Sequence, residues 1–517
     1  MTIEAPLPDA AAGSAVAPWE TVAPEEQLFV LITGANSGIG LGTGQRLIDD
    51  FFATRSLTAH LILIPTTRSA SKSLAAISAL RAHALYAAKT STALRARYDG
   101  EKEEYNWQDA VRRIHVLSLT LDLCDLRGVY AFAETLCRGR VSNPQGLEGE
   151  YLRDVRIPRL DTVIFNAAYG NWSGCNYPKA IWMILSEGLV QAVTYPTFKN
   201  SLPTSILNEQ ESYGYPEKPL LGEVFTACVF GHYVLAHQLL PLLSRHSESE
   251  SRGRIVWSSS IEAIEEVYVA DDMQCFLKPA AYESAKRLTD IISLSYSLPS
   301  VQKFSRPFLT IDQESGGDAA EKPVPPKMYL THPGVVASTL FPVPWFFFWA
   351  YELALVVARW IGSPWHNVDG YRGSTSAAWL ALQDQAALDE MQADRIKWGS
   401  STDRHLVSDV KKTEVDGWGW EGKVETSKTI AADTAAGVLH KSAGRRLGVK
   451  NATEESLVEF EEAGARAWEE MERLRHQWGE DYKAGETGVS DVFFDLFQFY
   501  TSFALLRDFN YYLLRTI

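Results

Sequence analysis

The 517-residue chain is 46% hydrophobic and 22% charged, with 35 glycines and 23 prolines, and these values exclude a collagen-like, mucin-like or wholly disordered protein. Its net charge of −15 gives no overall cationic surface, which argues against a nucleic-acid binder. The five cysteines form no CxxC pair and have no metal-ligand spacing, which indicates a reducing compartment and no metal site.

Short apolar runs alternate with segments of helical period over residues 25–340. Such runs are typical of strands buried on both faces, and the alternation is typical of βαβ units. We therefore expect an α/β domain with a doubly wound parallel sheet, a Rossmann fold interrupted by long insertions. The expected strands are 28–33, 61–64, 114–119, 162–165, 254–257 and 328–331, and the expected helices include 41–52, 126–136 and 224–243.

Three segments lie outside this alternation. Residues 1–24 have no signal-peptide pattern and predict a flexible leader. Residues 341–365 belong to an apolar stretch that predicts a segment lying in or spanning a membrane, or else a lid over a pocket. Residues 366–517 predict a helical extension with a polar insertion of low order at 400–445, a helix capped by Asn451, and an aromatic tail of unassigned role.

A glycine cluster follows the first expected strand and leads directly into a helix. Glycines at this place let the backbone turn tightly and approach a pyrophosphate, which the helix N-terminus then stabilises. An ordinary glycine turn is the alternative. The candidate cofactor-binding residues of this loop are Gly34, Asn36, Ser37, Gly38, Ile39 and Gly40.

The end of the second expected strand bears on the choice between NAD and NADP. A ribose hydroxyl calls for an Asp or Glu at this place, but the sequence continues IPTTRSASKS, with Arg68 and Lys72 and no carboxylate. A guanidinium can bind a 2′-phosphate through two charge-assisted hydrogen bonds, so the sequence favours NADP(H). A merely solvated Arg68 is the alternative.

The candidate catalytic residues are Ser260, Tyr282 and Lys286. Ser260 ends an expected strand, and Tyr282 and Lys286 are one helical turn apart. The Lys286 ammonium is expected to lower the phenol pKa from about 10, so that Tyr282 becomes a competent general acid, while the Ser260 hydroxyl holds the substrate oxygen.

The glycine loop, Ser260, Tyr282 and Lys286 follow one another in the order found in the short-chain dehydrogenase/reductases. The chain resembles this family over about residues 25–340. The resemblance implies that Asp122 contacts the adenine, that Asn166 steadies the central sheet near the cofactor and that Lys286 binds the nicotinamide ribose. It also implies that Pro333, Gly334 and Thr339 pass beside the nicotinamide amide. Asp122 and Asn166 could instead be polar residues at strand ends that satisfy loop amides.

Two features depart from the family pattern. The family usually has an Asn on the central helix, where it helps to build a proton relay, and the matching position here is Cys228, a weak hydrogen-bonding group. The separation of Ser260 from Tyr282 is also longer than usual. The relay therefore runs through other groups, or the true match lies a turn away.

The segments VFGHYVLAHQLLPLL, GRIVWSSSIEA and THPGVVASTLFPVPWF are similar to the sterol-reducing members of the family in fungal ergosterol biosynthesis. That resemblance implies NADPH-dependent reduction of the C-3 ketone of a 4-demethylated sterol to the 3β-alcohol. It also implies a place at the endoplasmic reticulum membrane or the lipid droplet, with the catalytic domain facing the cytosol and other enzymes of sterol C-4 demethylation as partners. The alternatives are a soluble reductase of another bulky ketone (a steroid 17-ketone or a secondary metabolite) and a non-catalytic scaffold for sterol enzymes. The oligomeric state stays open.

Overall fold

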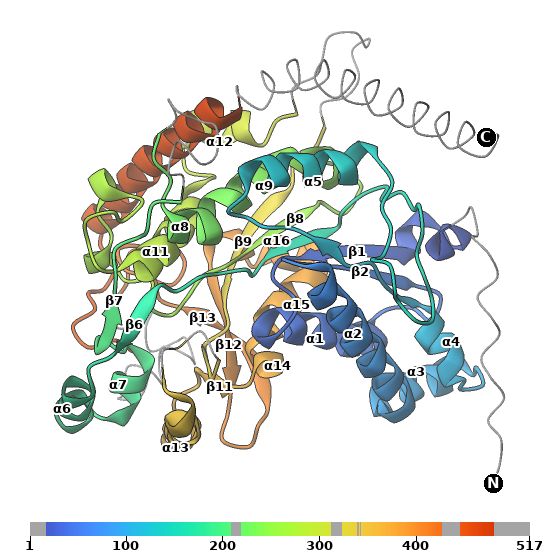
Figure 1. The fold of residues 1–517 in the computed structure, drawn as a ribbon, viewed down its shortest axis with the longest axis horizontal. Helices are drawn as coiled ribbons and strands as arrows, with labels where there is room; N and C mark the ends of the chain where they lie inside the picture. The colour runs from blue at the N-terminus through green and yellow to red at the C-terminus, as the bar shows by residue number, and fades with distance from the viewer. Residues whose placement is uncertain are drawn as a thin grey trace, which may run out of the picture.

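The computed structural model describes residues 17–207, 219–311, 323–338, 341, 343–426 and 445–479. Nine strands form the central sheet, and helices cover both of its faces (Figure 1). The strands of this sheet are β1 (Gln27–Ile32), β2 (His60–Thr67), β3 (Ile114–Val116), β4 (Leu119–Thr120), β5 (Thr162–Phe165), β8 (Arg254–Ser258), β9 (Lys327–His332), β12 (Lys397–Thr402) and β13 (Ser408–Thr413).

The sheet has the order β13-β12-β9-β8-β5-β1-β2-β3, and β4 pairs with β2. All neighbouring strands are parallel except β12 and β13. The chain runs from β1 outward to β2 and β3, then returns to the other side of β1 with β5, β8 and β9. The carboxyl ends of β1 and β5 therefore flank a topological switch point, where ligands of such sheets bind. The predicted doubly wound α/β sheet is confirmed.

Sixteen α-helical segments, six 3₁₀ turns, a π-helical turn and two small sheets are named in the described part of the chain. The helices are α1 (Gly38–Thr54), α2 (Ala70–Thr90), α3 (Thr92–Glu101), α4 (Trp107–Arg112), α5 (Leu126–Arg138), α6 (Tyr177–Glu187), α7 (Leu189–Thr194), α8 (Glu223–Phe225), α9 (Gly231–Gln238), α10 (Leu240–Leu243), α11 (Ala281–Ser295), α12 (Gln302–Phe308), α13 (Phe348–Ile361), α14 (Gly370–Gly373), α15 (Thr375–Leu382) and α16 (Gln385–Glu390). The 3₁₀ turns are η1 (Pro18–Thr21), η2 (Pro24–Glu26), η4 (Glu265–Val267), η5 (Ala270–Asp272), η6 (Trp345–Phe347) and η7 (Ala393–Arg395), and the π turn is η3 (Thr226–Phe230). The small sheets pair β6 (Trp172–Cys175) with β7 (Lys199–Ser201) and β10 (Val335–Val336) with β11 (His366–Val368). A further helix covers residues 454–479.

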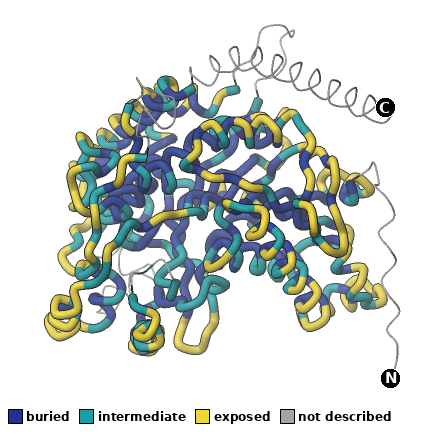
Figure 2. Tube along the Cα trace, viewed as in Figure 1, coloured by how far each residue is buried: buried dark blue, intermediate teal, exposed yellow. Residues whose placement is uncertain are grey.

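The central sheet separates two hydrophobic cores, as the side-chain period of two in a strand requires. Phe29 and Leu31 of β1 belong to the core shared with α5, α9 and α11, whereas Val30 and Ile32 belong to the core shared with α1 and α2. Figure 2 shows the buried strands between the more exposed helices. The apolar run 28–33 is thus explained by burial on both faces.

The folded part of the chain begins before residue 25, although residues 1–24 are predicted to be a flexible leader. Trp19 of η1 is fully buried, and its ring contacts Phe29 edge-on with the centroids 5.8 Å apart. The Gln27 side chain also donates a hydrogen bond to the Trp19 carbonyl. The prediction of a flexible leader is therefore wrong for residues 17–24, because one large aromatic side chain fixes them to the sheet.

The predicted low order of residues 400–445 is wrong for its first part. β12 and β13 extend the central sheet, and β12 is buried along its whole length although it reads KWGSST. Its polar side chains are satisfied internally: the Ser400 hydroxyl accepts from the Ser376 amide, and Thr402 donates to Asn367. Residues 427–444 and the aromatic tail lie outside the described residues.

The last described helix begins at residue 454, and its cap is not Asn451 as predicted. The Thr453 hydroxyl accepts from the Ser456 amide, and the Ser456 hydroxyl accepts from the Thr453 amide. Asn451 instead accepts a hydrogen bond from Arg445. Within the described ranges, no helix is long and apolar enough to cross a membrane, and α13 has 14 residues.

Candidate active site

The glycine loop joins β1 to α1 at the carboxyl edge of the sheet. Gly34 and Gly38 have φ values of +66° and +53°, which favour glycine. A side chain at Gly40 would place its Cβ 2.4 Å from the Gly34 carbonyl oxygen, so this position has no room for one. The Ser37 side chain does not cap α1 and instead accepts from Asn36, and Ile39 lies in the first turn. The residues therefore fit a backbone cradle for a pyrophosphate.

Asn166 ties β5 to this loop. Its side-chain amide donates to the carbonyls of Thr33 and Gly34 at 3.1 and 3.3 Å. The Thr33 hydroxyl in turn accepts from the backbone amides of Asn166 and Ala167. These hydrogen bonds hold the loop at the switch point between β1 and β5.

Arg68 and Lys72 lie where β2 passes into α2. β1 and β2 are parallel neighbours with Ile32 opposite Pro65, so Arg68 and the glycine loop emerge at the same edge. Both basic side chains are exposed. Asp122 is also exposed, and its carboxylate accepts from the Cys124 amide at 3.0 Å, as the loop-amide interpretation predicts.

The structure brings Ser260, Tyr282 and Lys286 together. The Ser260 hydroxyl lies close enough to the Tyr282 phenol to lower its pKa, and it accepts a hydrogen bond from the Glu262 amide at 3.1 Å. The Lys286 ammonium lies 5.7 Å from the centroid of the Tyr282 ring and donates to the Ser258 carbonyl at 2.7 Å. The residues directly after β8 and the first turns of α11 therefore supply the whole cluster.

The expected lowering of the Tyr282 pKa by Lys286 is not what the structure shows. Burial raises the pKa of the phenol, the Glu262 carboxylate and Cys228 add to this rise, and the Ser260 side chain opposes it. Burial also lowers the pKa of Lys286, whose ammonium donates to a backbone carbonyl. The phenol therefore stays protonated at neutral pH, and Lys286 is not among the groups that lower its pKa.

Cys228 lies in the π turn η3, close enough to Tyr282 and Lys286 to affect the pKa of both. Its sulfur contacts the backbone amide and carbonyl of Tyr169 at 3.4 Å. The Cys228 carbonyl accepts from Nδ1 of His232, and the other ring nitrogen of His232 contacts the Thr33 hydroxyl at 2.9 Å. The position matched to the family's Asn thus faces the site, and its backbone links the central helix to the glycine loop.

A buried charge cluster beside Tyr282 was missed by the sequence analysis. Lys199 of β7 forms ion pairs with Glu262 and with Glu283, the latter at 2.6 Å. The Lys199 ammonium lies 4.3 Å from the Trp172 ring centroid, and Trp172 packs against Tyr282 with centroids 4.8 Å apart. No motif marks this cluster, since its members come from an insertion and from residues next to the predicted ones.

Pro333 and Gly334 follow β9 at the same edge of the sheet. Gly334 has a φ of +66°, and its amide donates to Nδ1 of the buried His332. A Cβ at Gly334 would lie 2.3 Å from the Trp365 carbonyl oxygen. Thr339, the remaining predicted contact, lies outside the described residues.

Comparison with known proteins identifies the family. The 3-keto-steroid reductase of Gibberella zeae is 64% identical over 464 residues, which cover 90% of this chain and 97% of that protein. The 3-keto-steroid reductase of Aspergillus fumigatus is 36% identical over 465 residues, which cover 88% of this chain and 94% of that protein. No protein-family model matches the chain.

Among solved structures, a metagenomic short-chain oxidoreductase in complex with NADP is 15% identical and covers 69% of this chain and 92% of its own. The TM-score of this match is 0.31. The two curated relatives, in contrast, match this chain over nearly their whole length. The chain belongs to the 3-keto-steroid reductase family.

Proposed function

We propose that the protein reduces the C-3 ketone of a 4-demethylated sterol intermediate of ergosterol biosynthesis to the 3β-alcohol, with NADPH as the reductant. The observation that carries the proposal is the Ser260–Tyr282–Lys286 cluster beside the glycine loop, in a chain 64% identical to a 3-keto-steroid reductase. The names of the relatives give the substrate class, and the geometry gives the chemistry.

A bound reduced nicotinamide supplies the hydride for the carbonyl carbon. The Tyr282 phenol, kept protonated by burial and by Glu262, donates its proton to the carbonyl oxygen. The Ser260 hydroxyl, which lies close enough to Tyr282 to affect its pKa, orients that oxygen. Lys286 lies where its ammonium can stabilise the phenolate that results and hold the nicotinamide ribose.

The glycine loop and the uncapped start of α1 fit the pyrophosphate, and Arg68 and Lys72 fit a ribose 2′-phosphate. Position and resemblance assign Asp122 to the adenine and Pro333–Gly334 to the nicotinamide amide. The described edge offers exposed basic groups and no carboxylate directly after β2, which supports NADPH over NADH.

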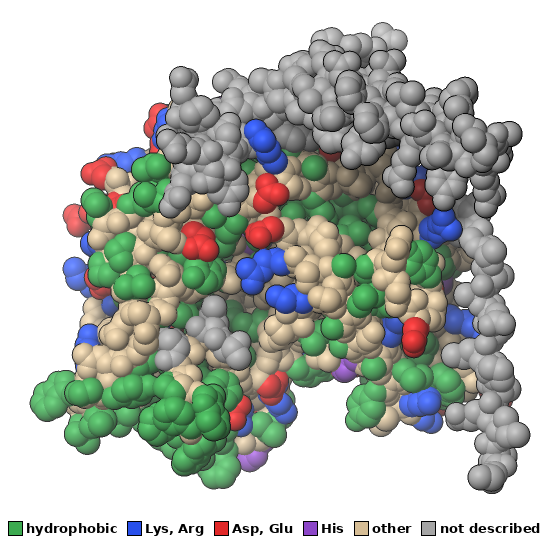
Figure 3. Space-filling view, viewed as in Figure 1, with side chains coloured by type: hydrophobic (Ala, Val, Ile, Leu, Met, Phe, Trp, Pro, Cys, Tyr) green, Lys and Arg blue, Asp and Glu red, His purple; other side chains and the backbone are tan. Residues whose placement is uncertain are grey.

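An apolar surface supports a place on a membrane. Hydrophobic side chains gather over α6 and α13 at the lower left of Figure 3. Trp182 on α6 is 68% exposed, and Trp345 and Trp349 around α13 are 87% and 66% exposed. The Tyr177 and Phe347 rings lie 6.2 Å apart and join the two elements. Aromatic residues of this kind favour a membrane–water boundary.

We propose that this membrane is the endoplasmic reticulum membrane or the surface of the lipid droplet, with the catalytic domain facing the cytosol and other sterol C-4 demethylation enzymes as partners, as the resemblance implies. Vesicle flotation tests the surface. Trp349→Asp should reduce binding to neutral phosphatidylcholine vesicles, whereas Tyr86→Asp, at a 66% exposed position on α2, should not. Equal binding of both variants would contradict the placement.

The activity is tested with purified protein, NADPH or NADH, and a panel of 3-keto and 17-keto steroids. We expect NADPH oxidation and the 3β-alcohol from 3-keto sterols, and no turnover by Tyr282→Phe. Turnover by that variant would refute the assigned proton donor, and turnover of 17-keto steroids alone would refute the substrate.

A further inference from the structure

Lys397 of β12 is a buried cation directly behind the candidate active site. Its side chain is 2% exposed, and its ammonium donates to the Ser260 carbonyl at 2.7 Å and to the Asp290 carboxylate at 2.6 Å. Asp290 is fully buried on α11, one turn beyond Lys286. A single ammonium thus joins Ser260, two residues beyond the end of β8, to the helix that carries Tyr282.

The same carboxylate completes a second connection between these elements. Asp290 accepts a hydrogen bond from the Ser259 hydroxyl, which also approaches the Lys286 carbonyl at 3.2 Å. Ser259 and Ser260 are therefore both fastened to α11, one through its side chain and the other through Lys397. All of these groups are buried, so water does not compete for them.

We propose that Lys397 is a positioning residue for the reduction: by fastening the Ser260 carbonyl to Asp290, it sets the spacing between the Ser260 and Tyr282 hydroxyls. The proposal rests on the proposed function of that cluster. It also gives β12, which lies beyond α13 in the chain, an indirect part in the active site through the Ser260 carbonyl.

The energetics of buried ion pairs favour this interpretation over a purely stabilising role. Removing two charges from water costs several kcal/mol per ion, and replacing both partners by apolar residues is often neutral or stabilising. Stability alone therefore does not require Lys397 and Asp290. What an apolar pair cannot do is donate to the Ser260 carbonyl.

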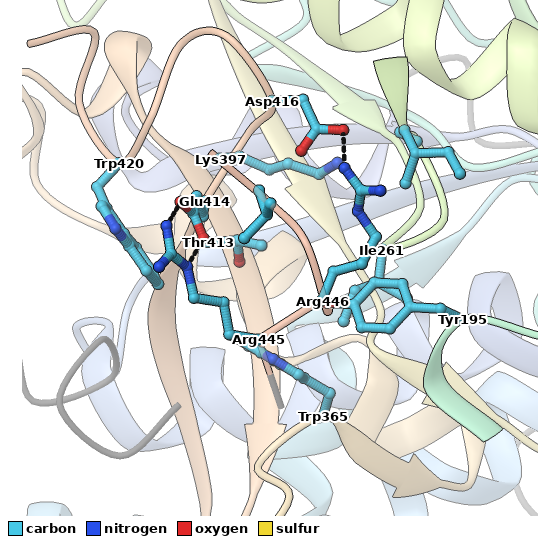
Figure 4. Close-up of a pocket in the computed structure, with 13 residues that line it drawn as sticks. Tyr195, Ile261, Trp365, Lys397, Thr413, Glu414, Asp416, Trp420, Arg445 and Arg446 are labelled. Atoms are coloured by element: carbon cyan, nitrogen blue, oxygen red, sulfur yellow. Dashed lines mark hydrogen bonds and ion pairs between the residues drawn. The ribbon is translucent and has the colours of Figure 1, made fainter. Parts of the chain in front are cut away.

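A cavity of about 40 Å³ adjoins Lys397, with Thr413, Asp416 and Arg446 among its lining residues (Figure 4). Arg446 is paired with Asp416 at 2.7 Å. The cavity is large enough to hold water. It lies beside the Ser260 turn, so the turn has space to move if its fastening is removed.

The electrostatics add a readout that a purely structural role would not move. The charged groups that face Lys397 are Asp290 and Arg287 from α11 and Asp416 from the segment after β13. The positive charge of Lys397 also lowers the pKa of Lys286 and of His332, although burial is the larger cause for both. Without Lys397, the pKa of Lys286 should rise.

The test compares Lys397→Met, Lys397→Arg and the double variant Lys397→Met/Asp290→Leu in full-length protein. For Lys397→Met we expect kcat for the 3-keto steroid to fall about 100-fold, as for a misplacement of roughly 1 Å, with little change in KM or in the NADPH dissociation constant. The basic limb of the kcat–pH profile should move to higher pH. Lys397→Arg, which keeps a donor, should recover part of kcat.

The matched control is Lys327→Met, which removes the more exposed ion pair between Lys327 and Asp389. Lys327 begins β9, at the end of the strand away from the active site, so this variant should leave kcat unchanged. The double variant separates positioning from folding, because it removes the charged pair without leaving one charge buried. If it melts like the wild type and remains slow, the proposal stands. If it melts like the wild type with full kcat, or if Lys397→Met keeps its kcat and pH profile, the proposal is overturned. A wild-type protein that reduces only other ketones would refute the proposed substrate instead, and the same comparison is then made with the ketone that it reduces.

Discussion

Removing the Lys199 ammonium should destabilise the fold strongly, because two carboxylates would then face each other in a buried place. The Lys199 side chain is 3% exposed, Glu283 is 9% exposed and Glu262 is 20% exposed, so solvent screens the cluster weakly. Breaking a buried ion pair by removing one partner costs about 3–5 kcal/mol. We expect Lys199→Met to lower the free energy of unfolding by about this amount at pH 8.

The deficit should depend on pH. Burial raises the pKa of the Glu262 carboxyl, Lys199 lowers it, and Glu283 raises it. Without Lys199 the pKa of Glu262 in the folded protein rises further above its unfolded value. The protonated carboxyl then contributes stability that is present at low pH and is lost as the pH rises through the folded pKa. The deficit should therefore be smaller at pH 5 than at pH 8.

Urea denaturation followed by tryptophan fluorescence at pH 5 and pH 8 measures both effects. The matched control is Lys179→Met, an exposed lysine of the same insertion that donates to the Thr197 carbonyl. It should change the free energy of unfolding by no more than about 0.5 kcal/mol. A Lys199→Met deficit below about 1 kcal/mol at pH 8, or one that is equal at both pH values, would refute the reasoning.

Three further predictions follow from the site and the core. Gly40→Ala should weaken NADPH binding about 5- to 150-fold, which corresponds to an overpacking cost of about 1–3 kcal/mol. The control is Gly100→Ala, because a Cβ at Gly100 has no atom within 4 Å. Fluorescence titration should show an unchanged NADPH dissociation constant for this control. Arg68→Ala should weaken NADPH binding about 10-fold or more and leave NADH binding nearly unchanged, because a charge-assisted phosphate contact contributes about 1.5–3 kcal/mol; equal losses for both would show that Arg68 does not read the 2′-phosphate. Urea midpoints should fall as the pH drops below about 6.5, because burial lowers the pKa of three histidines in the folded state and the unfolded chain takes up protons first; a flat profile between pH 7 and pH 5 would contradict this. Their pKa values are about 4, 3 and 3 for His60, His232 and His366.

The parts of the fold that the sequence could predict are those with a periodic apolar signal. The run 28–33 is buried on both faces of β1, and its hydrophobic character is sufficient to identify the strand. The glycine loop and the Tyr282–Lys286 spacing could be predicted because backbone approach and helical geometry restrict which residues can occupy those positions.

The parts that could not be predicted depend on contacts between residues distant in the chain. β12 has a polar sequence and is nevertheless buried, because Lys397 pairs with Asp290 and Thr402 donates to Asn367. No local sequence pattern reveals these distant partners. Lys199 is separated from Glu283 by more than eighty residues, and a single lysine in an insertion carries no signal. The burial of Trp19 could not be predicted, because a single aromatic residue after an Ala/Pro segment forms no repeating hydrophobic pattern.

The antiparallel strand β13 determines how the sheet terminates toward solvent. An open margin of a β-sheet offers unpaired backbone groups to any other extended chain, and proteins discourage such pairing with charged side chains. β13 carries Asp409, Lys411 and Lys412 at this margin, and Asp409 and Lys411 neutralise each other at 3.0 Å. The reversal of direction at residues 403–407 thus gives the catalytic sheet a hydrophilic border that resists association with a second molecule through its edge.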